Sequence, residues 1–198
     1  MCLLTEAIRV EKKELVNLEY HQARFDKARR DLLGIGGHIK LADAIKLPDD
    51  ITDEVYKCRI VYSDKIHSVD FNLYDKRLPA TMKLVYDDEI DYSFKYENRD
   101  RLNTLLKESM ADEILIVKNG MITDTSRSNV ILKRRSELIT PTSFLLDGTM
   151  RRFLLDKKMI YEENISVDDL FLFDKLYLIN AMLDIDNQPG IPVHQIKR

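Results

Sequence analysis

The clearest candidate for covalent chemistry is a lysine placed among aromatic residues. Lys95 lies between Phe94 and Tyr96, and Tyr92 stands three positions before it. Aromatic rings desolvate an amine, which lowers its pKa and makes it a nucleophile that can form an imine with a carbonyl compound. Alternatively, the aliphatic stem of Lys95 covers the rings while its ammonium group stays in water. This segment alone leaves both possibilities open.

Two further segments could bind an anion. Arg24 lies on a helix expected over Glu19–Leu33, and its planar guanidinium suits a phosphate dianion. Gly148 and Thr149 stand where a later helix should begin, so their backbone N–H groups have no helical acceptor and favour an anion. A solvated helical arginine and an ordinary helix N-terminus would explain the same residues.

A carboxylate precedes a strand expected at Asn129–Leu132. The sequence from Thr123 to Leu132 is TDTSRSNVIL, so Asp124 is followed by small polar residues and then by apolar ones. On its own this pattern is typical of a turn before a strand. A role for Asp124 in ligand binding needs support from elsewhere in the chain.

Composition limits the kind of protein. The chain has 198 residues, 44% hydrophobic and 33% charged, so it can bury a core without disulfides or metals. Its formal net charge of −3 argues against nucleic acid as the main partner, because phosphate binding needs a basic surplus. No apolar run reaches the ~18–20 residues of a membrane span, and no signal peptide is evident. Cys2 and Cys58 fit neither a disulfide framework nor a metal site, so we expect reduced thiols, no metal and a cytoplasmic protein.

Hydrophobic periodicity predicts an α+β chain of two domains, residues 1–76 and residues 77–198, with a crossover at the polar segment Asp75–Pro79. The predicted strands are Cys2–Val10, Leu15–Val16, Val55–Tyr62, Ile66–Leu73, Thr81–Val85, Ile90–Phe94, Glu113–Val117, Asn129–Leu132 and Lys175–Ile179. The predicted helices are Glu19–Leu33, Leu41–Ile45, Arg99–Met110 and Thr149–Lys157, with a helical turn at Asp168–Phe171 and a loop at Pro141–Gly148.

The glycines at Gly34–Gly37 do not indicate a nucleotide site. They follow a helix, whereas a dinucleotide fingerprint follows a strand, so we expect them to end that helix. The order of the elements is also unlike that of a doubly wound sheet.

Taken in order, the motifs resemble those of one family. The chain carries H-x-x-R from His21, K-x-x-N-R from Lys95, A-D-E-I-L-I-V-x-N-G-x-x-T-D-x-S-x-S-N from Ala111, and L-x-G-T-x-R from Leu146. Together these resemble the class IV aminotransferases, a pyridoxal-phosphate (PLP) family that includes branched-chain and D-amino-acid aminotransferases and 4-amino-4-deoxychorismate lyase. The resemblance implies a small N-terminal α/β domain, a larger β-rich C-terminal domain and a cofactor cleft between them. It also implies a homodimer acting on a small-molecule amine, with neither nucleic acid nor membrane as a partner.

The resemblance assigns roles to individual residues. Lys95 would be the catalytic Schiff-base lysine, and Arg24 would bind the cofactor phosphate. Asp124 falls where the family usually has a glutamate that contacts the pyridine nitrogen. The other expected cofactor-binding residues are Ser128, Asn129, Gly148, Thr149, Asn180 and Ala181. The candidate substrate-binding residues are Glu6, Arg9, Arg59 and Arg127.

The chain departs from the family pattern in two places. An aspartate at 124 is one methylene shorter than glutamate, so the ring must sit closer or a water must intervene. The family usually has a further strand and a glycine-rich stretch before the strand that begins at Cys2. We expect this second difference to affect the choice of substrate most.

Three functions remain open. K-x-x-N-R at Lys95, N-A-M at Asn180 and the pair Pro192–Val193 favour 4-amino-4-deoxychorismate lyase, which releases pyruvate and gives 4-aminobenzoate for folate. An amino acid transaminase of the branched-chain or D-amino-acid type is the first alternative. A degenerate, non-catalytic PLP-binding module is the second.

Overall fold

The computed structural model describes residues 2–186 and 188–198, which form two compact units. The first unit contains the residues up to Lys76 together with Phe94–Asn98, and the second contains Arg77–Ser93 and Arg99–Arg198. The chain leaves the first unit after Lys76, where the sequence places the crossover. The five residues around Lys95 return to the first unit, however, whereas the sequence prediction put them in the second domain.

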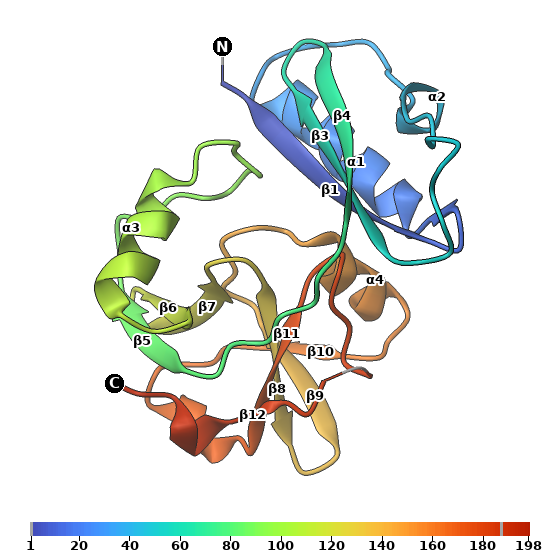
Figure 1. Cartoon of the computed structure of the whole chain (residues 1–198). Helices are drawn as coiled ribbons and strands as arrows, with labels where there is room; N and C mark the ends of the chain where they lie inside the picture. Colours follow the sequence, from blue (N-terminus) through green and yellow to red (C-terminus); the bar gives the residue numbers. More distant parts are fainter. Residues whose placement is uncertain (1, 187) are drawn as a thin grey trace. The chain divides into compact units, whose positions relative to one another are not determined.

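The first unit is an antiparallel sheet with helices on one face (Figure 1). Its strands run in the order β2-β1-β3-β4 and are β1 (Leu4–Glu11), β2 (Glu14–Leu15), β3 (Tyr56–Tyr62) and β4 (Ile66–Leu73). Its helices are α1 (Leu18–Asp31) and α2 (Leu41–Ala44). Alternate residues of β1 are fully buried, among them Leu4 and Ile8, and they pack with Phe25 of α1 in one core. All the strands and helices predicted for this unit are present, within two residues at each end.

The return segment pairs with the first strand. The Thr5 N–H donates to the Lys95 carbonyl at 2.9 Å, and Leu4 and Tyr96 form an antiparallel bridge. The strand predicted at Ile90–Phe94 is therefore wrong, because these residues form a turn and only Tyr96 pairs. Both the N–H and the hydroxyl of Ser93 bond to Asp91 Oδ1, at 3.0 and 2.8 Å, a local arrangement that competes with strand pairing.

The second unit contains two sheets and two helices. In the three-stranded sheet, β5 (Met82–Tyr86) is parallel to β6 (Glu113–Lys118), which pairs antiparallel with β7 (Met121–Thr125). The five-stranded sheet has the order β10-β9-β8-β11-β12. Its strands are β8 (Asn129–Arg134), β9 (Glu137–Pro141), β10 (Tyr161–Glu163), β11 (Lys175–Ile179) and β12 (Ile191–Pro192). The helices are α3 (Asp100–Ser109) and α4 (Thr149–Asp156), with 3-10 segments η1 (Asp169–Leu172) and η2 (Val193–Gln195).

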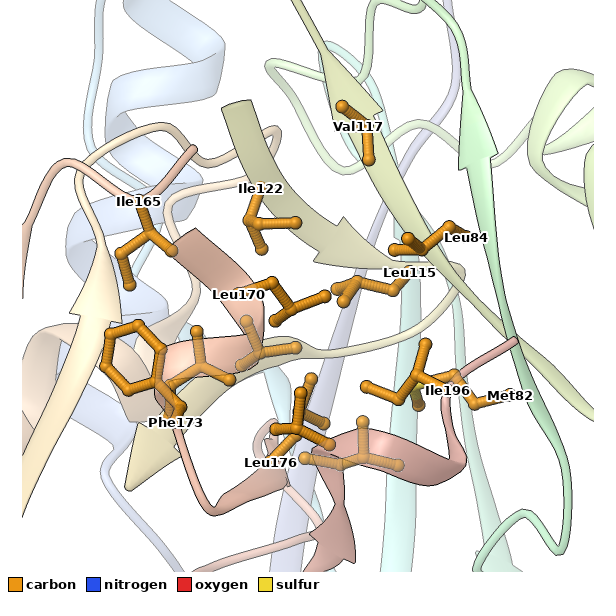
Figure 2. Close-up of a cluster of buried hydrophobic side chains, with 14 of the residues drawn as sticks. Met82, Leu84, Leu115, Val117, Ile122, Ile165, Leu170, Phe173, Leu176 and Ile196 are labelled. Atoms are coloured by element: carbon orange, nitrogen blue, oxygen red, sulfur yellow. The ribbon is translucent and has the colours of Figure 1, made fainter. Parts of the chain in front are cut away.

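Apolar side chains from both sheets meet in one core of the second unit. Figure 2 shows Leu84 and Leu115 from the three-stranded sheet in one cluster with Leu176 of β11, Leu170 of η1 and Ile196 near the end of the chain. Four strands of this unit, β7, β9, β10 and β12, were not predicted. β7 carries the polar sequence of the expected turn, yet its Thr123 hydroxyl is buried and donates to the Ile116 carbonyl at 2.8 Å. Pairing with β6 outweighs the local preference for a turn.

Both cysteines are free thiols, Cys58 buried and Cys2 exposed. Among residues 2–186 and 188–198, no helix combines the length and apolar character needed to cross a bilayer. The same residues contain no group of three or more His, Cys, Asp or Glu side chains placed to hold a metal ion.

Candidate active site

In the first unit, a buried carboxylate binds the predicted phosphate arginine. Glu6, on β1, has no exposed surface. Arg24 of α1 donates from Nε to Glu6 Oε1 at 2.9 Å and from Nη2 to Oε2 at 2.6 Å. His21, one helical turn earlier, places Nδ1 2.6 Å from the same Oε2. The spacing H-x-x-R therefore presents both side chains on one helix face to a single carboxylate, and the two-bond contact fixes the plane of the guanidinium.

The protonation states of Glu6, His21 and Arg24 follow from their burial and from their contacts with one another. Burial raises the pKa of Glu6, but the charge of Arg24 and the hydrogen bonds from His21 and Arg24 outweigh burial and lower it to about 2. Burial lowers the pKa of His21 and outweighs the effect of Glu6. At neutral pH, Glu6 is an anion, Arg24 a cation and His21 a neutral ring that donates from Nδ1.

Lys95 is half-buried in the same unit, and its charge contributes to the lowered pKa of His21. The aromatic residues on either side of it pack against the core of the first unit, where the Phe94 and Tyr96 rings meet edge to face at 6.2 Å. The backbone of the lysine is held by the bond from Thr5. The aromatic neighbours thus anchor the segment that carries the lysine.

The predicted substrate residues of this unit separate onto two faces of the sheet. Glu6 faces α1, whereas Arg9 belongs to the alternate set of β1 and forms an ion pair with Glu11 at 2.8 Å. Arg59 of β3 lies directly across from Ala7, hence on the same face as Arg9, and bonds to Glu97 at 3.0 Å. Glu6, fully buried beside Arg24, is placed to orient that arginine, and it lies on the opposite face of β1 from Arg9.

In the second unit, Asp124 brings two distant motifs together. The backbone N–H groups of Leu146 and Leu145 donate to Asp124 Oδ2, at 2.9 and 3.1 Å. The Asn129 side-chain amide donates to Asp124 Oδ1 at 2.8 Å and also to the Leu146 carbonyl at 2.9 Å. TDTSRSN and LLDGT therefore form one buried polar network.

The Asp124 carboxylate has bonds but no cation of its own. Burial raises its pKa to about 6, against the bonds from Leu146, Asn129 and Leu145 and the charge of Arg151, which lower it. Within residues 2–186 and 188–198, no cationic side chain lies within ion-pair distance of it. Each carboxylate oxygen can accept about two hydrogen bonds. Oδ1 accepts only the bond from Asn129, so it can take one more donor, and a cationic N–H is the donor that would stabilise the ionised form.

The hydrogen-bond network of Asp124 and Asn129 also requires a glycine at position 148, directly before α4. Gly148 is the N-cap of α4, and a Cβ atom at this position would lie 1.8 Å from Asn129 Oδ1. No side chain larger than hydrogen fits there without displacing the amide that binds Asp124. Thr149, the first helical residue, is 5% exposed. The helix N-terminus predicted from the sequence is thus present, with Asn129 packed against it.

The loop after Asp124 is held from several elements. Glu113 Oε1, at the start of β6, accepts the Ser126 N–H at 3.0 Å, and Arg99, beside α3, donates to the Ser126 carbonyl. Asn180 donates from Nδ2 to Ser128 Oγ at 2.9 Å, whereas Arg127 is exposed. Arg99 and Glu113 both stand inside motifs quoted from the sequence, but the sequence assigned a role to neither.

The segment after β11 is a tight turn. Asn180 Oδ1 accepts the Met182 N–H at 2.8 Å, and the backbones of Asn180 and Leu183 bond to each other. Ala181 lies inside this turn and is half-buried. Two of the three motifs that resemble the lyase, those of Arg99 and Asn180, therefore hold the loop of Ser126 to Ser128. Their contacts are structural and do not by themselves select one chemistry.

Both a family model and a protein relative match this chain over much of its length. The family model described as amino-transferase class IV matches residues 93–196. An uncharacterised protein of Haemophilus influenzae is 34% identical over 182 residues, which is 90% of this chain and 97% of that protein.

Solved structures share the fold. A protein of Haemophilus somnus, provisionally named 4-amino-4-deoxychorismate lyase, has 32% identity and a TM-score of 0.85, covering 93% of this chain and 98% of its own. A hypothetical aminotransferase of Mycobacterium tuberculosis in a PLP-bound form has 16% identity and a TM-score of 0.75, covering 91% of this chain and 77% of its own. The second similarity concerns the fold alone.

Proposed function

Because the chain belongs to the class IV aminotransferase family and has its fold, we propose that it is a PLP-dependent enzyme in which Lys95 attaches the cofactor. The observation that carries this proposal is Asp124. A buried carboxylate with a raised pKa, a vacant acceptor position and no cationic partner among the described residues matches a pyridinium N–H. Each unit also offers a group whose own chemistry suits a phosphate dianion: the oriented guanidinium of Arg24 in the first and the helix N-terminus at Gly148 in the second.

The residues of the chain have distinct tasks in this proposal. When bound, PLP supplies an electron sink for the carbanion formed next to the substrate nitrogen. Asp124 keeps a proton on the pyridine nitrogen, which maintains that sink. Arg24 binds the phosphate, and Glu6 holds the guanidinium in the plane that makes this possible. Lys95, with its amine free, would accept at Nζ the proton from the carbon next to the substrate nitrogen.

We further propose that the reaction is the lyase reaction on 4-amino-4-deoxychorismate. After proton removal, the C–O bond to the enolpyruvyl group breaks, the group takes up a proton and leaves as pyruvate, and the ring becomes the aromatic 4-aminobenzoate. The name of the Haemophilus somnus protein supports this assignment, together with the motifs at Lys95, Asn180 and Pro192. Arg9 and Arg59, which share one face of the sheet, are the proposed donors to the substrate carboxylates.

The cofactor assignment can be tested without a substrate. Purified protein mixed with PLP should turn yellow, and borohydride should fix the cofactor to Lys95, as read by peptide mass spectrometry. Lys95→Ala should abolish both the label and turnover. A colourless protein, or a label on another lysine, would contradict the proposal and favour a non-catalytic module or a different site.

The chemistry is tested by the need for a keto acid. The lyase should release pyruvate and 4-aminobenzoate in equal amounts from aminodeoxychorismate with no keto acid added. A transaminase, the activity suggested by the name of the Mycobacterium tuberculosis protein, would instead lose its yellow band with one amino acid and regain it with the matching keto acid. That result would replace the lyase proposal and leave the cofactor assignment intact.

A further inference from the structure

A second buried charge lies on α4, the helix that follows the loop bonded to Asp124. Arg151, the third residue of α4, is 2% exposed and is among the largest fully buried side chains of the chain. Its Nη2 donates to the Pro141 carbonyl at 3.0 Å and to Glu162 Oε1 at 2.5 Å. Its Nε is buried and has no hydrogen-bond partner among the described residues. Burial of an incompletely bonded guanidinium is costly, so stability alone does not explain an arginine at this position.

The contacts of Arg151 lie along one loop. The loop runs from Pro141, at the end of β9, to Gly148, at the N-cap of α4. Arg151 bonds to the first of these residues, and its guanidinium lies 4.3 Å from the centre of the Phe144 ring, in the middle of the loop. The next two residues, Leu145 and Leu146, donate their N–H groups to Asp124. One side chain therefore braces the segment that supplies two of the three bonds to the carboxylate.

We propose that Arg151 is a positioning residue for Asp124: it fixes the Pro141–Gly148 loop so that two successive N–H groups meet the carboxylate. Its importance for catalysis rests on the proposed role of Asp124 opposite the pyridine nitrogen. Glu162, from the edge strand β10, is the carboxylate that faces Arg151 directly. Of the charged side chains, Arg151 from α4 is the one whose effect on Asp124 is resolved; Asn129 of β8 and the loop contribute neutral donors.

The test measures the ionisation of Asp124 itself. Protein with ¹³C-labelled aspartate is titrated by NMR before and after PLP is added, and the Asp124 signal is assigned by its loss in Asp124→Asn. Arg151→Met removes the charge and the donors at similar volume and should raise the titration midpoint by at least half a pH unit. Arg151→Lys keeps the charge and should recover part of that shift. Arg152→Met, which changes an exposed arginine one position along the helix, should leave the midpoint unchanged.

The Arg151 variants change a buried residue and could fail to fold, so a second variant changes its more exposed partner Glu162. Glu162 is partly exposed, so Glu162→Gln should fold, and it removes the carboxylate that neutralises Arg151. The Asp124 midpoint should then fall. An unchanged midpoint in both Glu162→Gln and a folded Arg151 variant would overturn the proposal. The midpoint without PLP does not depend on the proposed function, so a protein that never binds PLP would refute that function and leave the role of Arg151 to be decided by the titration.

Discussion

Each unit buries a carboxylate of the proposed site, and the pKa values of the two carboxylates are shifted in opposite directions. Glu6 is fully buried but bonds to Arg24 and His21, and its pKa falls to about 2. Asp124 is equally enclosed but bonds to neutral N–H groups, and burial raises its pKa to about 6. Neutral donors reduce the cost of burying an anion, whereas an adjacent cation reverses it.

Glu6 forms a complete ion pair within the protein, whereas the proposed cationic partner of Asp124 is a ligand. In the first unit the protein supplies both charges, so Glu6 has nothing left to bind and acts through Arg24. In the second unit the protein supplies an anion and leaves one acceptor position on Oδ1. Substitution of Glu6 should therefore lower mainly the free energy of unfolding, and substitution of Asp124 should lower mainly the catalytic rate.

The largest expected effect is on the stability of the first unit. Glu6→Gln removes the fully buried counter-ion of the half-buried Arg24, and breaking a buried ion pair typically costs about 3–5 kcal/mol. Urea unfolding at pH 7 should show this loss, whereas Glu19→Gln, on the exposed surface of α1, should show almost none. Equal stability of Glu6→Gln and the native protein would mean that the ion pair does not stabilise the unit.

The corresponding change in the second unit should affect the rate. Asp124→Ala removes the carboxylate opposite the pyridine nitrogen, and the loss of one such electrostatic contact lowers kcat on the order of 100- to 1,000-fold. Some cofactor should still bind through Lys95 and Arg24, as seen in the visible spectrum. Asp124→Glu should be the mildest substitution. If Asp124→Ala and native enzyme turned over alike, the aspartate would be only a structural residue.

The pH dependence of stability should have opposite signs for the two groups. The folded pKa of Glu6 is about 2, below its ordinary 4.5, so its stabilisation of about 3 kcal/mol is present above pH 4.5 and lost as the pH falls toward 2. The folded pKa of Asp124 is about 6, above its ordinary 3.8, so the cofactor-free protein should gain up to about 3 kcal/mol from this group as the pH falls from 6 to 4. Unfolding curves of the native protein and Asp124→Asn isolate the second term. A native protein that tracked Asp124→Asn between pH 4 and 6 would contradict it.

Local sequence patterns predicted most of the strands and helices. The strands and contacts that they missed depend on partners far away in the sequence. Alternation located β1, β3, β4 and β11, because each buries one or both faces in a core. β7 was hidden because its polar residues find partners only when β6 lies beside them. Asp124, Asn129 and Gly148 were assigned roles through motifs. Glu113 and Arg151 stand in the same motifs but received no role, because their hydrogen-bond partners Ser126 and Pro141 lie ten or more positions away, which no local pattern reveals.

The smallest expected effect is on PLP binding, and it tests whether the ion pair of the first unit serves the cofactor as well as stability. Arg24→Met removes a charge-assisted bond to the cofactor phosphate and should weaken PLP binding by about 1.5–3 kcal/mol. Arg30→Met, at an exposed position on the same helix, is the matched control and should leave the dissociation constant unchanged. Glu6→Gln should weaken PLP binding as well, although Glu6 lies buried beneath Arg24, because the guanidinium loses the two bonds that set its plane. Since both variants act on one guanidinium, the double variant should weaken PLP binding no more than Arg24→Met alone. Additive losses would show that Glu6 affects the cofactor by another route, and that the ion pair of the first unit is not the device that presents Arg24 to the phosphate.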